Sequence, residues 1–179
     1  PEFMVSHCKR TYWFSRMLAL QWRIAFDDEI LFVGSILHDI ALMQAFDKRL
    51  PSDHCFTLPS ARCARDVVQH AGGWSEERIR RVMEVITFNP NPRVDPKDGG
   101  VEAHLVNAGV LVDATGLRLW EIHPSDVARV LDKHPRLDMK RLIVEDFDRE
   151  VDCHPGCRFA FAKRWLFFTL LVKMAPFEG

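Results

Sequence analysis

The sequence predicts an all-α fold, a compact single-domain bundle of about seven or eight helices. Apolar residues recur at helical spacing along most of the chain, and no convincing alternating strand pattern is present. Gly, Pro, Asp and Ser residues separate these segments at the points where helices are expected to begin and end. At 179 residues the chain is long enough to bury one sizeable core.

The first half of the chain predicts four helices. Asp27 or Asp28 is expected to cap the second helix, and Ser75 the fourth. A loop is expected at 46–59, and the pair Gly72-Gly73 should end the third helix. The fourth helix should end near residue 88, because three Pro and two Gly follow in "NPNPRVDPKDGG". The expected ranges are 5–23, 28–44, 60–70 and 76–88.

The second half predicts four more helices. Gly116 is a good residue to end the fifth, and "PSD" at 124–126 should open the sixth, which Pro135 closes. The expected ranges are 101–115, 124–134, 138–152 and 157–174. Residues 1–3 precede Met4 and look like a vector-derived scar, so the domain is expected to cover 4–179.

Composition excludes several classes of partner. The formal net charge of −1 offers no general attraction to nucleic acid or to an anionic membrane. The most apolar segment, "WLFFTLLV" at 165–172, is too short to span a bilayer. Five Cys at irregular spacing, without a secretory signal, indicate reduced thiols and a cytoplasmic protein.

His38 and Asp39 stand next to each other inside the otherwise apolar stretch "EILFVGSILHDIAL". A helix that is apolar nearly all round should be central and buried, so both polar groups need partners. A lone buried His is more often satisfied by a backbone carbonyl. Adjacent imidazole and carboxylate groups, about 100° apart on a helix, instead favour a divalent cation.

Two further residues extend this set. His7 opens the first helix, with Arg10 one turn later on the same face. Asp113 lies in "VNAGVLVDATG", where small Ala108 and Gly109 would let helices approach closely. A carboxylate in the last turn of a helix is unfavourable unless a cation is near.

In this order, His7, His38-Asp39 and Asp113 resemble the H…HD…D signature of the HD superfamily of metal-dependent hydrolases. The flanking segments "HCKRTYWFSRMLALQ", "DDEILFVGSILHDIAL" and "VEAHLVNAGVLVDATG" are similar to its cyanamide-hydratase-like branch. The resemblance covers about 5–141, most of the chain.

The resemblance implies the HD-domain fold and one divalent metal ion, Zn²⁺ first and Fe, Mn or Co as alternatives. It implies that His7, His38, Asp39 and Asp113 are the metal ligands, and that the metal activates a water. Asp39 then has a catalytic role, with Arg10 or Asn89 orienting the substrate or the ligands.

The chain departs from that family at two positions. Relatives carry a Phe-Glu pair where this chain has Phe56-Thr57, and an "ALHT"-type motif where it has "TFNP" at 87–90. A carboxylate and an imidazole are thus missing, and Asn89 cannot carry a proton near neutral pH. The substrate is expected to differ from cyanamide, or turnover is slow or lost.

Other His and Cys residues are weaker candidates for the metal site. His54 and His70 are candidates for replacement roles, whereas surface and capping positions are commoner for His. His104, His123, His134 and His154 are expected outside the site. Cys8 should serve packing, and "CHPGC" at 153–157 is weak evidence for zinc without a second ligand pair. The aromatic cluster at 159–168 is expected to be core, with self-association into a homo-oligomer left open.

Three functions remain open. The first is a metal-dependent hydrolase or hydratase acting on a small molecule. The second is a phosphohydrolase for nucleotides or other phosphomonoesters, for which Lys9, Arg10 and Arg16 could supply cations. The third is a metal-stabilised binding module with reduced or lost catalysis, indicated by Thr57 and Asn89.

Overall fold

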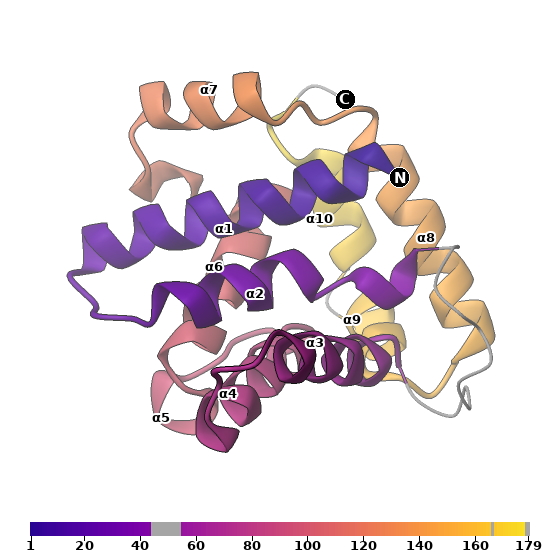
Figure 1. Cartoon of the computed structure of the whole chain (residues 1–179). Coiled ribbons are helices and arrows are strands. Elements are labelled where there is room, and N and C mark those ends of the chain that lie inside the picture. The colour runs from indigo at the N-terminus through magenta and orange to yellow at the C-terminus, as the bar shows by residue number, and fades with distance from the viewer. Residues whose placement is uncertain (44–54, 166, 178–179) are drawn as a thin grey trace.

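The computed structural model describes residues 1–43, 55–165 and 167–177, and within these ranges every regular element is a helix. The all-α prediction is therefore confirmed for the described chain (Figure 1). The helices of the first half are α1 (Glu2–Trp22), α2 (Asp28–Leu37), α3 (Thr57–Ala71) and α4 (Glu76–Phe88). Those of the second half are α5 (Pro96–Gly99), α6 (Val101–Thr115), α7 (Pro124–Lys133), α8 (Met139–Cys153), α9 (Arg158–Trp165) and α10 (Phe168–Met174).

Helix starts follow the predicted caps. The side chain of Asp27 accepts hydrogen bonds from the backbone N–H groups of Glu29 and Ile30, and Ser75 accepts one from Arg78. Each cap satisfies a donor that the first helical turn leaves without a partner. At the end of α6, Gly116 adopts the left-handed conformation, with φ of 75°. None of the described helices is both long and apolar enough to cross a membrane.

The structure corrects several boundaries. α2 ends at Leu37 rather than at residue 44, and a short 3₁₀ turn follows at Ile40–Leu42. α3 begins at Thr57 rather than at residue 60, because Pro59 is tolerated in a first helical turn. The expected helix 157–174 is two helices, α9 and α10, with Phe167 between them at φ of 52°.

The first helix also begins before residue 4, where the domain was expected to start. α1 begins at Glu2, and Phe3 is buried among side chains that include Phe147 of α8. The expectation of a buried aromatic cluster holds only in part. Phe159 is buried, whereas Phe161 and Phe167 are more than half exposed.

α1 and α6 cross the molecule side by side, and their close approach positions the site (Figure 1). Gly109 of α6 lies directly against α1, where a Cβ atom would come within 2.2 Å of Ser15 Oγ and 2.6 Å of the Thr11 carbonyl oxygen. Only a residue without a side chain fits there, as the small residues of α6 predict. One turn beyond Gly109 stands Asp113, and one turn before Thr11 stands His7. The close contact therefore brings these two side chains together.

Candidate metal centre

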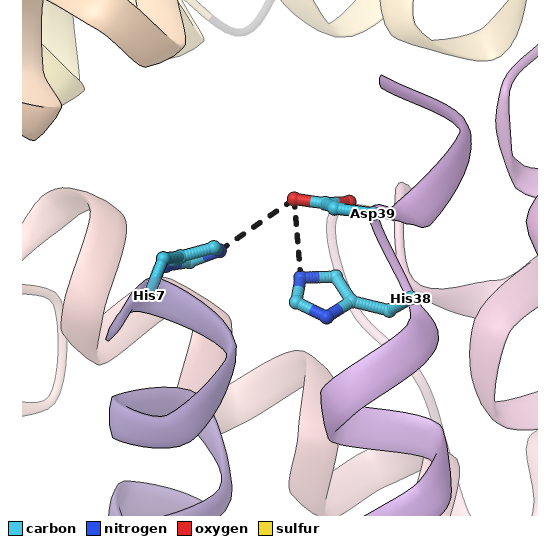
Figure 2. Close-up of side chains that lie close together, drawn as sticks. All are labelled: His7, His38 and Asp39. Carbon is cyan, nitrogen blue, oxygen red and sulfur yellow. Dashed lines mark ion pairs between the residues drawn. The ribbon is translucent and has the colours of Figure 1, made fainter. Parts of the chain in front are cut away.

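Three buried side chains converge where α1 meets the end of α2 (Figure 2). Asp39 Oδ2 lies 3.2 Å from His38 Nε2 and 3.6 Å from His7 Nε2. All three side chains are almost fully shielded from solvent. The early end of α2 explains this placement, because Asp39 leaves the helical conformation, with φ of −112°, directly after His38. Neighbours in sequence can therefore both face His7.

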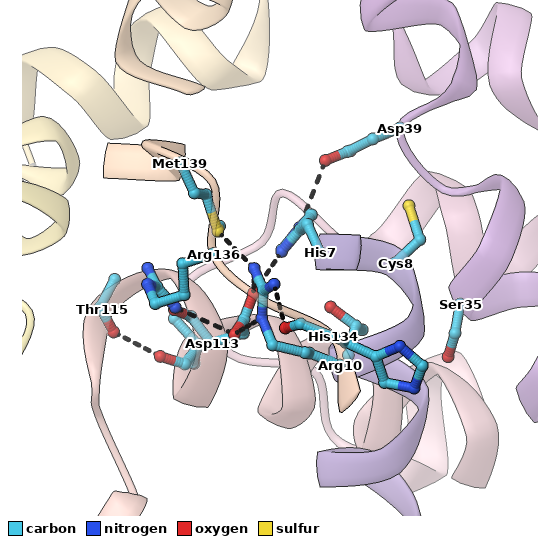
Figure 3. Close-up of polar contacts among 12 residues, drawn as sticks. His7, Cys8, Arg10, Ser35, Asp39, Asp113, Thr115, His134, Arg136 and Met139 are labelled. Atoms are coloured by element: carbon cyan, nitrogen blue, oxygen red, sulfur yellow. Dashed lines mark hydrogen bonds and ion pairs between the residues drawn. The ribbon is translucent and has the colours of Figure 1, made fainter. Parts of the chain in front are cut away.

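Hydrogen bonds on the far sides of both rings determine which nitrogen faces the cluster. His38 Nδ1–H donates to the carbonyl oxygen of Ser35 at 2.8 Å, since a carbonyl can only accept. His7 Nδ1–H donates to Asp113 Oδ2 at 2.6 Å (Figure 3). In the neutral imidazoles, the Nε2 lone pairs then both point toward the Asp39 carboxylate. A metal-binding His is held in the same way, by a carboxylate or a carbonyl on its other nitrogen.

This donor set fits a divalent cation. Two imidazole lone pairs and a carboxylate oxygen are all acceptors, and in this arrangement none of them can satisfy another without a proton or a cation. His38 is fully buried, and when its ring is neutral, Nε2 faces only the Asp39 carboxylate and makes no hydrogen bond within the described part of the chain. Two buried acceptors facing each other in this way are costly. A metal ion shared by His7, His38 and Asp39 would satisfy all three groups at once.

Protons compete for the same positions. Burial opposes charge on His38, but the Asp39 carboxylate outweighs it and raises the pKa of His38 to about 10. Burial likewise opposes charge on His7, while Asp113 and Asp39 raise its pKa above the usual value. Burial also disfavours the Asp39 carboxylate, but His38 and His7 hold the pKa of Asp39 well below its usual range. A metal ion binding here must therefore displace protons.

The structure places Asp113 behind His7 rather than among the converging ligand atoms (Figure 3). This differs from the expected four-ligand set. Besides accepting from His7, the Asp113 carboxylate accepts from Arg10 Nε at 2.7 Å and from Arg136 Nη1 at 3.1 Å. Burial opposes its charge, but His7 and Arg10 lower the pKa of Asp113 well below its usual range. The cation expected near this helix end is thus largely supplied by two guanidinium groups.

Of the two roles expected of Arg10, its contacts fit the orientation of a metal ligand rather than of the substrate. It is completely buried, and its Nη1 donates to the carbonyl oxygens of His134 and Pro135 at 2.9 Å each. Its Nε and Nη2 form a fork on the two oxygens of Asp113. Arg10 therefore orients Asp113, and through it His7, without lining the pocket. Arg136, which shares this role, carried no signal in the sequence.

A cavity of about 50 Å³ opens beside the cluster, with His7 and Asp39 in its wall. Its remaining surface is mostly apolar and aromatic, with Phe56 and Phe159 among the lining side chains. Asn89 lies in the wall as expected, and its Oδ1 has no hydrogen-bond partner within the described chain. Asn107, which was not predicted, also lines the cavity, and its Nδ2 donates to the carbonyl oxygen of Asn89.

The other candidates of the sequence lie apart from the cavity or outside the described residues. Thr57 is buried at the start of α3 but does not line the cavity, and His70 is exposed. His54 falls within the undescribed range 44–54. Cys8 is packed in the core as expected, yet its Sγ also lies 3.9 Å from His38 Nδ1.

The remaining histidines have structural contacts, as predicted. His104 Nδ1–H donates to the carbonyl oxygen of Val94, and His123 caps α7. The carbonyl oxygen of His134 accepts from Arg10. His154 lies on Glu150, away from the His7 cluster.

Comparisons with known proteins identify no family for this chain. A scan against known protein families finds no match, and a search of curated protein sequences finds no significant relative. The function must therefore be argued from the site itself.

Proposed function

We propose that this chain is a mononuclear metal-dependent hydrolase or hydratase that acts on a small, uncharged molecule. The observation that carries the proposal is the convergence of His7, His38 and Asp39 at the wall of a cavity, where the buried His38 Nε2 has only the Asp39 carboxylate beside it, at 3.2 Å. The order of these residues resembles the HD superfamily, which supports the same conclusion independently of the geometry.

Three protein ligands are typical of a catalytic rather than a structural site. Two imidazoles and one carboxylate suit Zn²⁺ first, with Fe²⁺, Mn²⁺ and Co²⁺ as alternatives of the same donor preference. When bound, such an ion supplies Lewis acidity and lowers the pKa of water toward neutrality. The chain itself holds His7 in one tautomer through Asp113, and Arg10 and Arg136 fix that carboxylate.

The cavity favours a small, neutral substrate. A volume of about 50 Å³ has room for only a few non-hydrogen atoms. Phe56 and Phe159 would exclude water around the substrate, while Asn89 and Asn107 offer uncharged polar groups for its orientation. Electrophilic carbon compounds such as nitriles, cyanamides and small amides have this size and charge.

The phosphohydrolase alternative has less support. No Lys or Arg is among the described residues that line the cavity, whereas phosphate recognition needs cationic donors. Of the cations expected to supply them, Arg10 is engaged by Asp113 and buried carbonyls, and Arg16 pairs with Asp28.

The experiment compares the purified protein with Asp39→Asn and with Asp66→Asn, a matched control on an exposed carboxylate of α3. Each protein is loaded in turn with Zn²⁺, Co²⁺, Mn²⁺ or Fe²⁺, its metal content is measured, and it is assayed on a nitrile, cyanamide and amide panel and on a nucleotide panel. We expect Asp39→Asn to hold about one equivalent of metal less than wild type and to lose turnover of the first panel. Asp66→Asn should match wild type.

Two outcomes contradict the proposal. Turnover of nucleotides alone would assign the phosphohydrolase function instead. Metal binding that depends on Asp39, without turnover of either panel, would make the chain a metal-stabilised binding module.

A further inference from the structure

A second group of side chains that could bind a metal lies outside the His7 cluster. Cys55 stands just before α3, Cys157 just before α9, and Glu150 in the last turn of α8. One ligand atom from each of these three residues lies within 4.8 Å of the other two. All three side chains are partly buried. Three separate segments of the chain thus bring donor atoms to one point.

Backbone N–H groups face both sulfur atoms. The N–H of Ala160 donates to Cys157 Sγ at 3.3 Å, and those of Thr57 and Phe159 donate to the sulfur of Cys55. These donors belong to the first turns of α3 and α9, where N–H groups have no partner within the helix. Donors of this kind favour negative charge on sulfur, as they do around metal-bound thiolates. In the metal-free chain, burial and the adjacent Cys157 outweigh these donors and raise the pKa of Cys55 to about 12, so a metal ion must displace the thiol proton.

The Glu150 carboxylate is also held in place by neighbouring groups. Its Oε1 accepts from the backbone N–H of Phe56 at 2.8 Å and lies 3.1 Å from His154 Nδ1. His154 Nε2 is shielded from solvent and has no hydrogen-bond partner among the described residues. Thiolates and a carboxylate are ligand types that Zn²⁺ accepts, and His154 stands behind Glu150 rather than among the converging atoms. A disulfide between Cys55 and Cys157 would involve only the two sulfur atoms and would not require the neighbouring Glu150 carboxylate.

We propose that Cys55, Glu150 and Cys157 bind a Zn²⁺ ion that joins the segment before α3 to the corner between α8 and α9. The sequence "CHPGC" indicated a zinc site only weakly, because its two cysteines lack a second pair. In the structure, Cys157 has a different neighbour. Cys153 of that motif is exposed, whereas the Cys157 side chain lies close to Cys55, about a hundred residues earlier. This site is independent of the proposed catalytic function.

The ion would fix two walls of the cavity. Phe56 directly follows Cys55, and Phe159 comes two residues after Cys157. Their rings pack at a centroid distance of 6.0 Å, and both line the cavity. Binding a metal to the folded but not to the unfolded chain stabilises the fold by mass action. Loss of this ion should therefore loosen the aromatic wall.

Cobalt(II) substitution tests this site specifically, because thiolate ligation produces a sulfur-to-cobalt charge-transfer band that imidazole and carboxylate ligands do not. The reduced, metal-free wild-type protein is titrated with Co²⁺ beside Cys55→Ser, Cys157→Ser and Cys153→Ser. We expect the band in wild type and in the matched control Cys153→Ser. Cys55→Ser and Cys157→Ser should each lose the band and bind about one equivalent less metal. His38→Ala, which removes a ligand of the other cluster, should keep the band.

Absence of the band in reduced wild type would overturn the proposal, as would its persistence in the Cys55→Ser/Cys157→Ser double variant. Isolation of a Cys55–Cys157 disulfide that resists mild reductant would likewise replace the metal site by a cross-link. If the Ser variants fail to fold, zinc-edge X-ray absorption of wild type decides. Sulfur neighbours at about 2.3 Å support the site, and shells of nitrogen and oxygen alone contradict it.

Discussion

At the scale of single residues, the behaviour of the site follows from a chain of buried contacts. His7 faces the Asp39 carboxylate through one nitrogen and Asp113 through the other. Asp113 is in turn fixed by Arg10 and Arg136. Because the interior screens charge poorly, each member of such a chain depends on the next. Removing one member leaves an uncompensated charge.

Arg10→Ala is therefore expected to destabilise the protein by about 3–5 kcal/mol, because it leaves Asp113 without its bidentate partner. Urea unfolding followed by circular dichroism measures this change. Arg16→Ala is the matched control on the same helix, and its partly exposed pair with Asp28 should contribute less than about 1 kcal/mol. Equal effects of the two substitutions would contradict the role given to Arg10.

The protonation of His38 in the metal-free chain predicts how the stabilisation of the fold by a bound metal ion depends on pH. In the metal-free chain, Asp39 outweighs the effect of burial and raises the pKa of His38 to about 10, against about 6.5 in the unfolded chain. This proton stabilises the folded state fully below about pH 6.5, and the contribution is lost as the pH rises through about 10. A bound metal ion replaces the proton and does not leave as the pH rises.

We therefore expect the difference in Tm between protein with Zn²⁺ and protein with EDTA to increase from pH 6.5 to pH 9. The measurement uses the Cys55→Ser/Cys157→Ser background, so that only the His7 cluster responds. In the same background, Asp39→Asn should show little difference at any pH. A difference that shrinks as the pH rises would contradict this account.

At the scale of helices, local sequence signals predicted some boundaries and missed others. Asp27, Ser75 and Gly116 act within one turn of the chain, so their effects could be anticipated from neighbouring residues alone. The end of α2 could not, because the apolar sequence continues past Asp39 at helical spacing. The break at Phe167 has no Gly or Pro to indicate it. After α2, the turn is held by a distant residue, because the Ala41 N–H donates to Ser60 Oγ.

The contact between α1 and α6 gives the prediction at this scale. Gly109→Ala would place a methyl group against Ser15 and the backbone of Thr11. Although Ala favours a helix over Gly, we expect a net loss of stability of about 1–3 kcal/mol and weaker metal binding, because His7 is displaced from Asp39. Chemical unfolding and metal titration measure the two effects. Gly156→Ala is the control, and it should change neither stability nor metal affinity because the space around its Cβ position is open. A Gly109→Ala protein with unchanged stability and metal affinity would show that the close approach of α1 and α6 is not required.

At the scale of the whole molecule, the fold brings residues more than a hundred positions apart into one site. The sequence indicated His7, His38 and Asp39 because charged groups in apolar helices need partners. It could not show that Asp113 would turn toward two arginines, since Arg136 lies outside any helix and carries no periodic signal. It also could not pair Cys157 with Cys55, because only the contacts of Phe56 with Glu150 and Phe159 bring these distant segments together.

The most direct test of the central claim is a crystal structure of the protein grown with Zn²⁺, with anomalous data collected on both sides of the zinc absorption edge. We predict an anomalous peak about 2.0–2.2 Å from His7 Nε2, His38 Nε2 and Asp39 Oδ2. An anomalous map with no peak between these three atoms, in crystals saturated with zinc, would contradict the account.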